Sequence, residues 1–246
     1  MQPRSDQGAW VADITWSEVA KRVAAGAAGI LPIGASCKEH GFHLPMNTDQ
    51  IQAEWFARQL VQDRNILIWP AVTYGYYPAF VDYPGSCSLT KMTFSSCVYD
   101  ILQGIIRTAV HRTIVINTGI STIGPLQTAI DMLEGNNRIT LFNAYSGPCF
   151  KRAQSEVEEQ SAGGHADEVE TSIMLAIAPG LVDMSKAGKC IVHKQAGPFN
   201  RTKPEQPNYS PSGVNGDATL ATAEKGKRLV RAILDDLNDQ FENCRS

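Results

Sequence analysis

Two short stretches of the sequence hold the residue types that could do chemistry. From residue 34 to residue 49 the chain reads GASCKEHGFHLPMNTD, which places a thiol, an amine, two carboxylates and two imidazoles close together. His40 and Asp49 offer the nitrogen and oxygen ligands that zinc, manganese or iron accept. A third ligand is expected in the second stretch, GGHADEVETS. Its candidates there are His165, Asp167, Glu168 and Glu170.

The same residues also suit purely structural roles. His40 could be a hydrogen-bonded loop histidine, and Asp49 could cap the helix that follows it. Glu168 or Glu170 could simply be carboxylates in a first helical turn, where they favour the helix dipole. Residue type and spacing therefore leave a metal site and a structural role both open.

Buried strands and amphipathic helices alternate along the chain, and these elements must position the two stretches. The apolar run GILPIG predicts a short buried strand that ends at Gly34. The first stretch therefore emerges at the C-terminal end of a strand, where α/β sheets build their ligand crevices. Further strands are expected within residues 65–75, 113–119 and 138–147, and helices within residues 15–26, 48–63, 93–113, 124–136, 166–182 and 218–241.

This alternation of strands with helices of ten or more residues predicts βαβ units. We expect an α/β fold with a central, mostly parallel β-sheet and helices on both faces. Neither an internal repeat nor a linker rich in Gly, Ser or Pro divides the chain, so residues 1–246 are expected to form a single domain.

Composition argues against several classes of protein. The chain is 43 % hydrophobic and 19 % charged, with a net charge of −3, so neither a nucleic-acid partner nor a membrane is expected. Apolar stretches such as VAAGAAGILPIG are broken by Gly and Pro well short of a membrane span. The N-terminus lacks the pattern of a secretory signal, and the six cysteines are scattered, as is typical of reduced thiols. We therefore expect a cytoplasmic protein in which Cys37 is a buried, inert thiol.

Four motifs along the chain carry a resemblance to a known family. They are LPIGASCKEHGFHLPMNTD, YPGSCSLT, HADEVETSIMLAIAPGLVDM and SGVNGDATLATAEKGKRLV, in this order. The first resembles LP-[IV]-G-S-x-E-Q-H-G-P-H-L-P-x-x-T-D of the creatininase (creatinine amidohydrolase) family, and the others are similar to later motifs of that family. The resemblance implies a single α/β domain, an oligomer that is commonly a hexamer, and a two-metal active site at the C-terminal ends of the strands.

One of the family's two metal sites is intact in this sequence. By resemblance, its ligands correspond to His40, Asp49 and Glu170. His165 corresponds to the family's histidine beside the reaction centre. The resemblance therefore implies one divalent ion per chain, which could be zinc, manganese or iron.

The other metal site has lost both of its private ligands. Lys38 stands where a metal-binding glutamate is usual, and Gly119, in NTGIST, stands where a metal-binding histidine is usual. The Lys38 ammonium is expected to occupy the place of the lost ion and to balance Asp49. An alternative is that Glu39, displaced by a one-residue insertion upstream, replaces the lost ligand. Alternation along an extended segment instead predicts that Glu39 points away from the site.

These residues predict a metal-dependent hydrolase. A metal with three protein ligands and open positions polarises a carbonyl and activates water. The resemblance implies action on an amide (C–N) bond, other than a peptide bond, of a small cyclic or linear nitrogenous compound. His165 is the expected proton shuttle, with Glu168 as an alternative. The residues expected to contact the substrate are His43, Tyr76, Tyr77 and Asn117.

Two other functions stay open at this point. One is hydrolysis of a formamide or a lactone. The other is a non-catalytic binding or scaffolding role, in a family member that has lost one metal site.

The polar segment 196–216 is long for a compact domain, which favours a functional lid or a subunit contact. Together with the family resemblance, it predicts a homo-oligomer, expected to be a hexamer. In that assembly this segment or the aromatic loop 74–85 would help to complete the pocket of a neighbouring subunit.

Overall fold

A five-stranded parallel sheet forms the centre of the computed structural model, which describes residues 8–61, 64–134, 136–192 and 195–243. Its strands are β1 (Ala9–Trp10), β2 (Ala28–Ile33), β3 (Ile66–Ile68), β4 (Thr113–Asn117) and β5 (Ile139–Asn143). They lie in the order β1-β3-β2-β4-β5, and every neighbouring pair is parallel. The expected α/β class with a mostly parallel sheet is confirmed.

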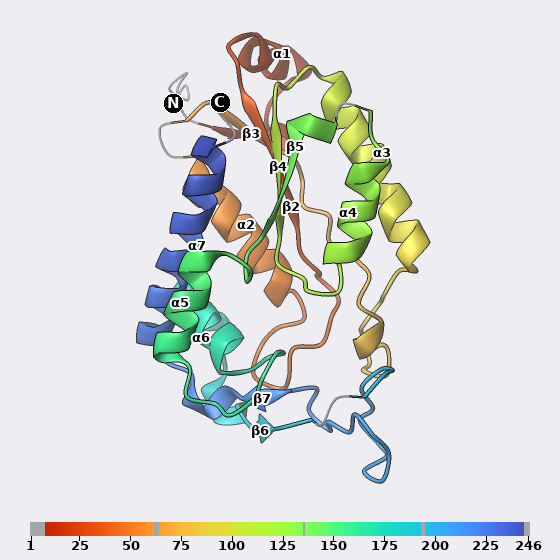
Figure 1. Ribbon diagram of the computed structural model, residues 1–246, viewed down its shortest axis with the longest axis vertical. Helices are drawn as coiled ribbons and strands as arrows, with labels where there is room; N and C mark the ends of the chain where they lie inside the picture. Colours follow the sequence, from red (N-terminus) through yellow and green to blue (C-terminus); the bar gives the residue numbers. More distant parts are fainter. Residues whose placement is uncertain (1–7, 62–63, 135, 193–194, 244–246) are drawn as a thin grey trace.

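Helices cover both faces of the sheet (Figure 1). They are α1 (Trp16–Ala24), α2 (Thr48–Leu60), α3 (Lys91–Arg107), α4 (Ile123–Asp131), α5 (Pro148–Val157), α6 (Glu168–Ile177) and α7 (Ala223–Asn243). Short 3₁₀ turns lie at Val11–Asp13, Pro78–Phe80, Asn136–Arg138, Pro179–Leu181, Met184–Lys186 and Ala218–Leu220. Within the described part of the chain, none of the helices combines the length and the apolar character needed to cross a membrane.

Alternating residues of the central strands pack into the two opposite layers, as the pleat of a strand requires. Ile30 of β2 and Ile114 of β4 lie in the larger core, with α2, α5, α6 and α7. Their neighbours Leu31 and Val115 lie in the smaller core, with α3 and α4. The sheet is therefore buried on both sides, which explains why its strands read as unbroken apolar runs.

Helix α5 is the one α-helix in the described residues that the sequence pattern did not predict. Pro148 opens it, directly after Gly147. The first free N–H groups, those of Cys149 and Phe150, donate to the carboxylate of Asp236 at 3.0 and 2.8 Å. Because that carboxylate comes from α7, far along the chain, the signal that starts α5 is absent from its own neighbourhood.

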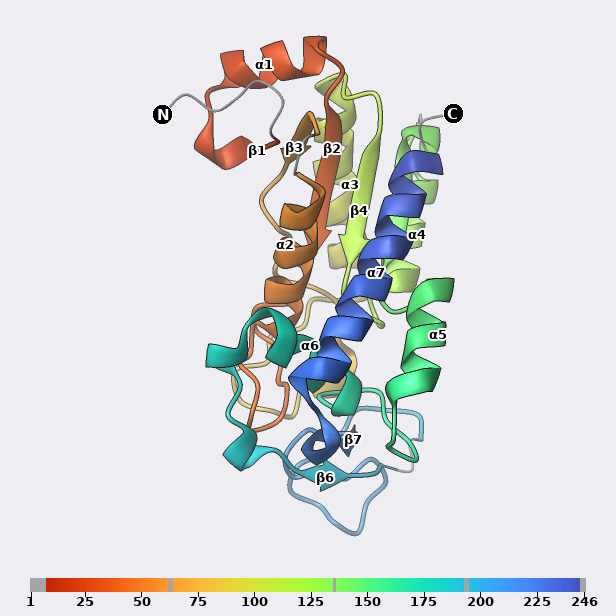
Figure 2. The ribbon, with the colours of Figure 1, turned by 90° about the vertical axis from the view of Figure 1, so that its left-hand side faces the viewer.

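The loops that follow the central strands gather at one end of the molecule (Figure 2). The last residues of β2 and β4, Ile33 and Asn117, are paired at that edge of the sheet. A small antiparallel sheet of β6 (Lys189–Cys190) and β7 (Gly216–Asp217) lies at the same end. The first chemical stretch, which directly follows β2, therefore emerges at the C-terminal edge of the sheet, as expected.

The polar segment 196–216 packs onto loops of its own chain. Phe199 joins a small buried cluster with Tyr77, Phe80 and Tyr83. The Tyr83 hydroxyl donates to the Ser210 carbonyl oxygen at 2.6 Å. This segment therefore covers the aromatic loop 74–85.

Candidate metal centre

Three segments bring six ionisable side chains together, which we call the site cluster. Its members are Lys38, Glu39, His40, Asp49, His165 and Glu170. The first three lie in the loop after β2, and Asp49 lies in the first turn of α2. His165 lies just before α6, and Glu170 lies in its first turn. All six are buried, with at most 9 % of any of these residues exposed.

The start of α2 lies unusually close to the end of β2, and this fixes Asp49 in the cluster. A Cβ atom on Gly34 would lie 2.3 Å from the Asp49 carbonyl oxygen, so only glycine permits this approach. The Thr118 hydroxyl donates to the same carbonyl oxygen at 2.8 Å. The close approach of the α2 backbone is therefore the structural reason for a glycine directly after β2.

His40 is held with one ring nitrogen facing the cluster. Its Nδ1 lies 2.9 Å from the Lys38 carbonyl oxygen. A carbonyl can only accept, so Nδ1 donates to it, which leaves Nε2 as the ring nitrogen that faces the carboxylates. That nitrogen lies 3.0 Å from Asp49 Oδ1 and 3.6 Å from Glu170 Oε1. The backbone contact therefore prepares His40 as a metal ligand through Nε2.

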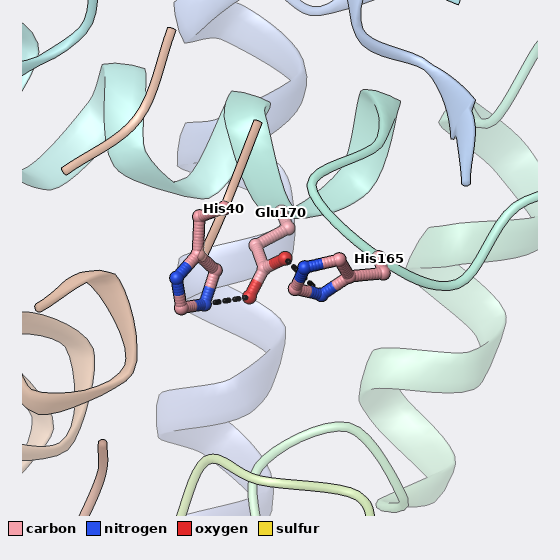
Figure 3. Close-up of side chains that lie close together, drawn as sticks. All are labelled: His40, His165 and Glu170. Carbon is pink, nitrogen blue, oxygen red and sulfur yellow. Dashed lines mark ion pairs between the residues drawn. The ribbon is translucent and has the colours of Figure 1, made fainter. Parts of the chain in front are cut away.

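The donor atoms of His40, His165 and Glu170 all lie within 4.8 Å of one another. Figure 3 shows the Glu170 carboxylate between the two imidazoles. His40 Nε2 is 3.6 Å from one carboxylate oxygen, and His165 Nδ1 is 3.8 Å from the other. Ligands at the usual zinc distances would lie about 3.4 Å apart in a tetrahedral site. This spacing fits a divalent ion after small movements, and within the described residues the set contains His165 where the sequence predicted Asp49.

His165 is oriented by a carboxylate on its other side. Its Nε2 lies 2.5 Å from Glu39 Oε1 and 2.9 Å from the Glu39 carbonyl oxygen. Both are acceptors, so Nε2 carries the proton, and Nδ1 is left facing Glu170. Burial disfavours the imidazolium, but the charge and hydrogen bond of Glu39 outweigh it and raise the pKa of His165. The ring also packs on Phe80, with the centroids 4.1 Å apart.

The expectation that Glu39 points away from the site is wrong. Its carboxylate faces His165 and also accepts from the Gly41 N–H at 2.8 Å. The chain bends at Ser36–Cys37 and turns at Gly41–His43 instead of continuing as an extended segment, so neighbouring side chains do not alternate. Gly213, whose φ is +86°, makes room for it, because a Cβ there would lie 1.7 Å from Glu39 Oε2. Glu39 thus joins the cluster as the partner of His165.

Lys38 forms a buried ion pair with Asp49. The Nζ–Oδ2 distance is 2.7 Å, and the two side chains are 9 % and 3 % exposed. Burial would lower the pKa of Lys38, but the charges of Asp49 and Glu170 outweigh it and raise that pKa. Conversely, burial alone would raise the pKa of Asp49, and the charges of Lys38 and His40 hold it well below its usual range. Both groups are therefore charged at neutral pH.

The site cluster carries an excess of negative charge. The carboxylates of Glu39, Asp49 and Glu170 are buried together with a single ammonium, that of Lys38. The three carboxylates therefore outnumber the one ammonium by two. Buried charge of this kind is expensive unless it is compensated. A divalent cation would compensate it, which is a second reason why these residues fit a metal ion.

Two other sequence-predicted residues make contacts outside this cluster. Glu168 accepts from the N–H groups of Glu159 and Gln160 at 2.9 and 2.7 Å, and its Oε1 lies 2.6 Å from Lys225 Nζ. Its carboxylate is thus engaged in holding α6 and α7 together. His43 Nε2 lies 2.8 Å from the Thr171 hydroxyl, and burial lowers the pKa of this imidazole.

A small cavity opens next to Lys38 and Asp49. Tyr77 and Asn117 line it, as does Gly119. The Tyr77 hydroxyl donates to the Cys87 carbonyl at 2.7 Å, and the Asn117 amide donates to Asn143 at 2.8 Å. Tyr76 instead packs against the core beneath α3 and α4. Of the four expected substrate contacts, the structure places Tyr77 and Asn117 in this cavity.

Two features of the site were not evident from residue type. The pairing of Glu39 with His165 depends on a contact between residues 126 positions apart. The space for Glu39 depends on Gly213, in the motif SGVNG, and a glycine that must adopt a positive φ is the signal that could have revealed it.

Comparison with known proteins identifies the family. The family model for creatininase (creatinine amidohydrolase) matches residues 12–241. The chain belongs to the creatininase family. The resemblance deduced from its motifs is thereby confirmed.

Relatives of this chain are hydrolases with different substrates. The creatinine amidohydrolase of Pseudomonas putida is 26 % identical, over 94 % of this chain and 97 % of that protein. The 3-dehydro-scyllo-inosose hydrolase of Thermotoga maritima is 25 % identical, over 94 % of this chain and 81 % of that protein. A mycofactocin precursor peptide peptidase of Mycolicibacterium smegmatis is 25 % identical, over 87 % of this chain and 83 % of that protein. Family membership therefore implies hydrolysis without fixing the substrate.

Solved creatininase structures share the fold. The structure described as creatininase Mn matches with a TM-score of 0.81 and 23 % identity, covering 96 % of this chain and 98 % of that one. A Zn-Zn type structure of a creatininase mutant also matches with a TM-score of 0.81 and 23 % identity, covering 95 % and 97 % of the two chains. These matches extend the agreement in fold to nearly the whole chain.

Proposed function

We propose that this chain is a metal-dependent hydrolase that cleaves an amide (C–N) bond of a small cyclic or linear nitrogenous compound. The observation that carries the proposal is that Asp49 and Glu170 both approach His40 Nε2, at 3.0 and 3.6 Å, beside an imidazole, His165, that a carboxylate holds in place. Membership of a family whose relatives hydrolyse amide-type bonds supports the same reaction class.

His40, Asp49 and Glu170 would hold about one divalent ion, which could be zinc, manganese or iron. When bound, such an ion polarises a substrate carbonyl and lowers the pKa of a water molecule. The two charges of the ion and the one charge of Lys38 together balance the three carboxylates of the site cluster. Lys38 keeps Asp49 ionised and supplies the positive charge that a second ion gives in two-metal relatives. The chain therefore needs only one metal.

His165 acts as the proton shuttle. Its Nδ1 faces the cluster with a lone pair, because Nε2 donates to Glu39. It takes a proton from the attacking water at Nδ1 and passes it to the leaving nitrogen. The Glu39 carboxylate stabilises the imidazolium that exists between these two transfers, as the raised pKa of His165 indicates. Phe80, packed on the ring, restricts access of bulk water.

Metal-loaded protein assayed on a panel of amides, formamides and lactones tests this proposal. We expect turnover of an amide that is abolished by a chelator, is restored by zinc or manganese, and is absent from Glu170→Gln. Preferential turnover of a formamide or a lactone would show that the substrate class is that compound and not the proposed amide. Metal-loaded protein that binds panel compounds without turning any over would contradict the proposal and favour a binding role.

We also propose a homo-oligomer, with a hexamer as the expected form. Exposed apolar side chains occur in loops at the C-terminal end of the sheet: Phe42, Val81 and Ile120 are 65 %, 54 % and 64 % exposed. Contact with neighbouring copies would bury them. Segment 196–216 already covers the aromatic loop of its own chain, so we assign it the role of a cover for the site.

A further inference from the structure

Two cysteines from different loops lie side by side next to the site cluster. The Cys87 N–H donates to the Cys37 carbonyl oxygen at 2.9 Å. With standard bond lengths, that contact keeps the two Cα atoms within about 7 Å of each other. Disulfides join Cα atoms that are about 4.4–6.8 Å apart. The backbone therefore already holds Cys37 and Cys87 at a distance that a disulfide can bridge.

The side chains of both cysteines approach one phenol, that of Tyr74. Electrostatic interaction with Cys37, and then with Cys87, raises the pKa of the Tyr74 hydroxyl. Both cysteines therefore lie in the neighbourhood of the same phenol. Both cysteines are free thiols; Cys37 is half-buried and Cys87 is exposed. The expectation that Cys37 is buried is therefore wrong. Because Cys87 is exposed, a small molecule can reach the pair from its side.

We propose that Cys37 and Cys87 form a redox-active thiol pair that closes reversibly to a disulfide. The oxidant is a low-molecular-weight disulfide such as glutathione disulfide. The exposed Cys87 thiolate attacks one sulfur of the oxidant, whose S–S bond breaks and releases one glutathione. The Cys37 thiolate then attacks Cys87 Sγ in this mixed disulfide, which forms the Cys37–Cys87 bond and releases a second glutathione. The two thiol protons pass to the two glutathione thiolates, so two thiols are oxidised and one disulfide is reduced.

Closure of this pair would act on the site through the loop after β2. Cys37 directly precedes Lys38 and Glu39, and Ser86 directly precedes Cys87. The Glu39 N–H donates to the Ser86 hydroxyl at 3.0 Å. The cysteine bond would therefore fix a loop that carries half of the site cluster to the segment around Ser86. We expect lower turnover in the oxidised protein, and this consequence alone rests on the proposed function.

Peptide mapping of the full chain after treatment with glutathione disulfide tests the thiol pair directly. Trypsin places Cys37 in peptide 23–38 and Cys87 in peptide 65–91, without a further cysteine in either. We expect these two peptides to be joined, with a loss of about 2 Da, and to separate again under a thiol reductant. Cys97→Ser, which removes another exposed cysteine, should leave the joined peptides unchanged, whereas Cys87→Ser should abolish them.

Two results would overturn the proposal. A stable glutathione adduct on Cys87 with Cys37 still free would show that the second sulfur cannot reach the first. Absence of any modification of Cys87, under conditions that modify Cys97, would show that it is not reactive. If the disulfide forms and reverses while turnover stays constant, the pair exists but its coupling to the site is refuted. Absence of turnover in the reduced protein would instead count against the proposed hydrolase.

Discussion

Replacing Lys38 by methionine removes a buried cation while keeping most of the side-chain volume. In the folded protein its Nζ lies 2.7 Å from Asp49 Oδ2, and the Asp49 side chain is only 3 % exposed. The variant would leave that carboxylate buried with His40 as its remaining side-chain partner. Deleting one partner of a buried ion pair costs about 3–5 kcal/mol. We expect the lower part of this range, because the His40 contact survives.

For a chain of this length, each kcal/mol shifts the melting temperature by about 2–4 °C, so Lys38→Met should melt roughly 10 °C lower. Lys189→Met is the matched control. Its Nζ lies 3.2 Å from Asp217, but its side chain is 60 % exposed. An exposed pair contributes about 0–1 kcal/mol, so this control should melt close to the wild type.

The pH dependence of the stability difference between wild type and Lys38→Met shows whether the lost charge of Lys38, and not a change in side-chain shape, causes the destabilisation. In the wild type, the charges of Lys38 and His40 keep the pKa of Asp49 low against the opposing effect of burial. Without Lys38, burial raises that pKa, and the resulting penalty is relieved as falling pH protonates Asp49. In denaturant unfolding of chelator-treated protein, the gap between wild type and Lys38→Met should therefore narrow from pH 7 to pH 5. A loss below about 1 kcal/mol, or a gap that stays constant with pH, would refute this account of Lys38.

Three further predictions concern the rest of the site. Glu39→Gln should bind metal normally but lose turnover by about 10- to 100-fold, because the amide cannot stabilise a charged His165; unchanged turnover would refute that role. Gly213→Ala should lower the free energy of unfolding by about 2 kcal/mol, since its φ is +86° and its Cβ would overlap Glu39, whereas Gly188→Ala, with open space, should not; equal stability of the two variants would argue against this constraint. Light scattering at micromolar concentration should give an oligomer, with a hexamer expected, and an active monomer would rule this out.

The fold could be predicted because its signals are local. Thr15 accepts from the Glu18 N–H at 3.4 Å, as the capping pattern at the start of α1 predicted. The apolar runs that became β2 and β4 were visible for a similar reason, because each is buried on both faces. Helix α5 was missed because Asp236, which caps it, lies on another helix.

The candidate site could be predicted from the sequence only in part. The motifs indicated His40, Asp49 and Glu170, and the structure brings His40 close to both carboxylates. The orientation of Glu39 was not predictable, because it is set by a turn and by the space at Gly213, which lies far along the chain. The substrate could not be predicted from the sequence because the cavity beside Lys38 is assembled from four separate segments of the chain.

Metal content measured together with turnover tests the central claim most directly. The account holds that His40, Asp49 and Glu170 bind one ion and that His165 moves protons without binding it. Elemental analysis should therefore find about one ion per chain in the wild type, little in Asp49→Asn, and about one in His165→Asn, whose turnover is nevertheless lost. Two tightly held ions per chain, or a His165→Asn variant that loses its ion, would contradict the account.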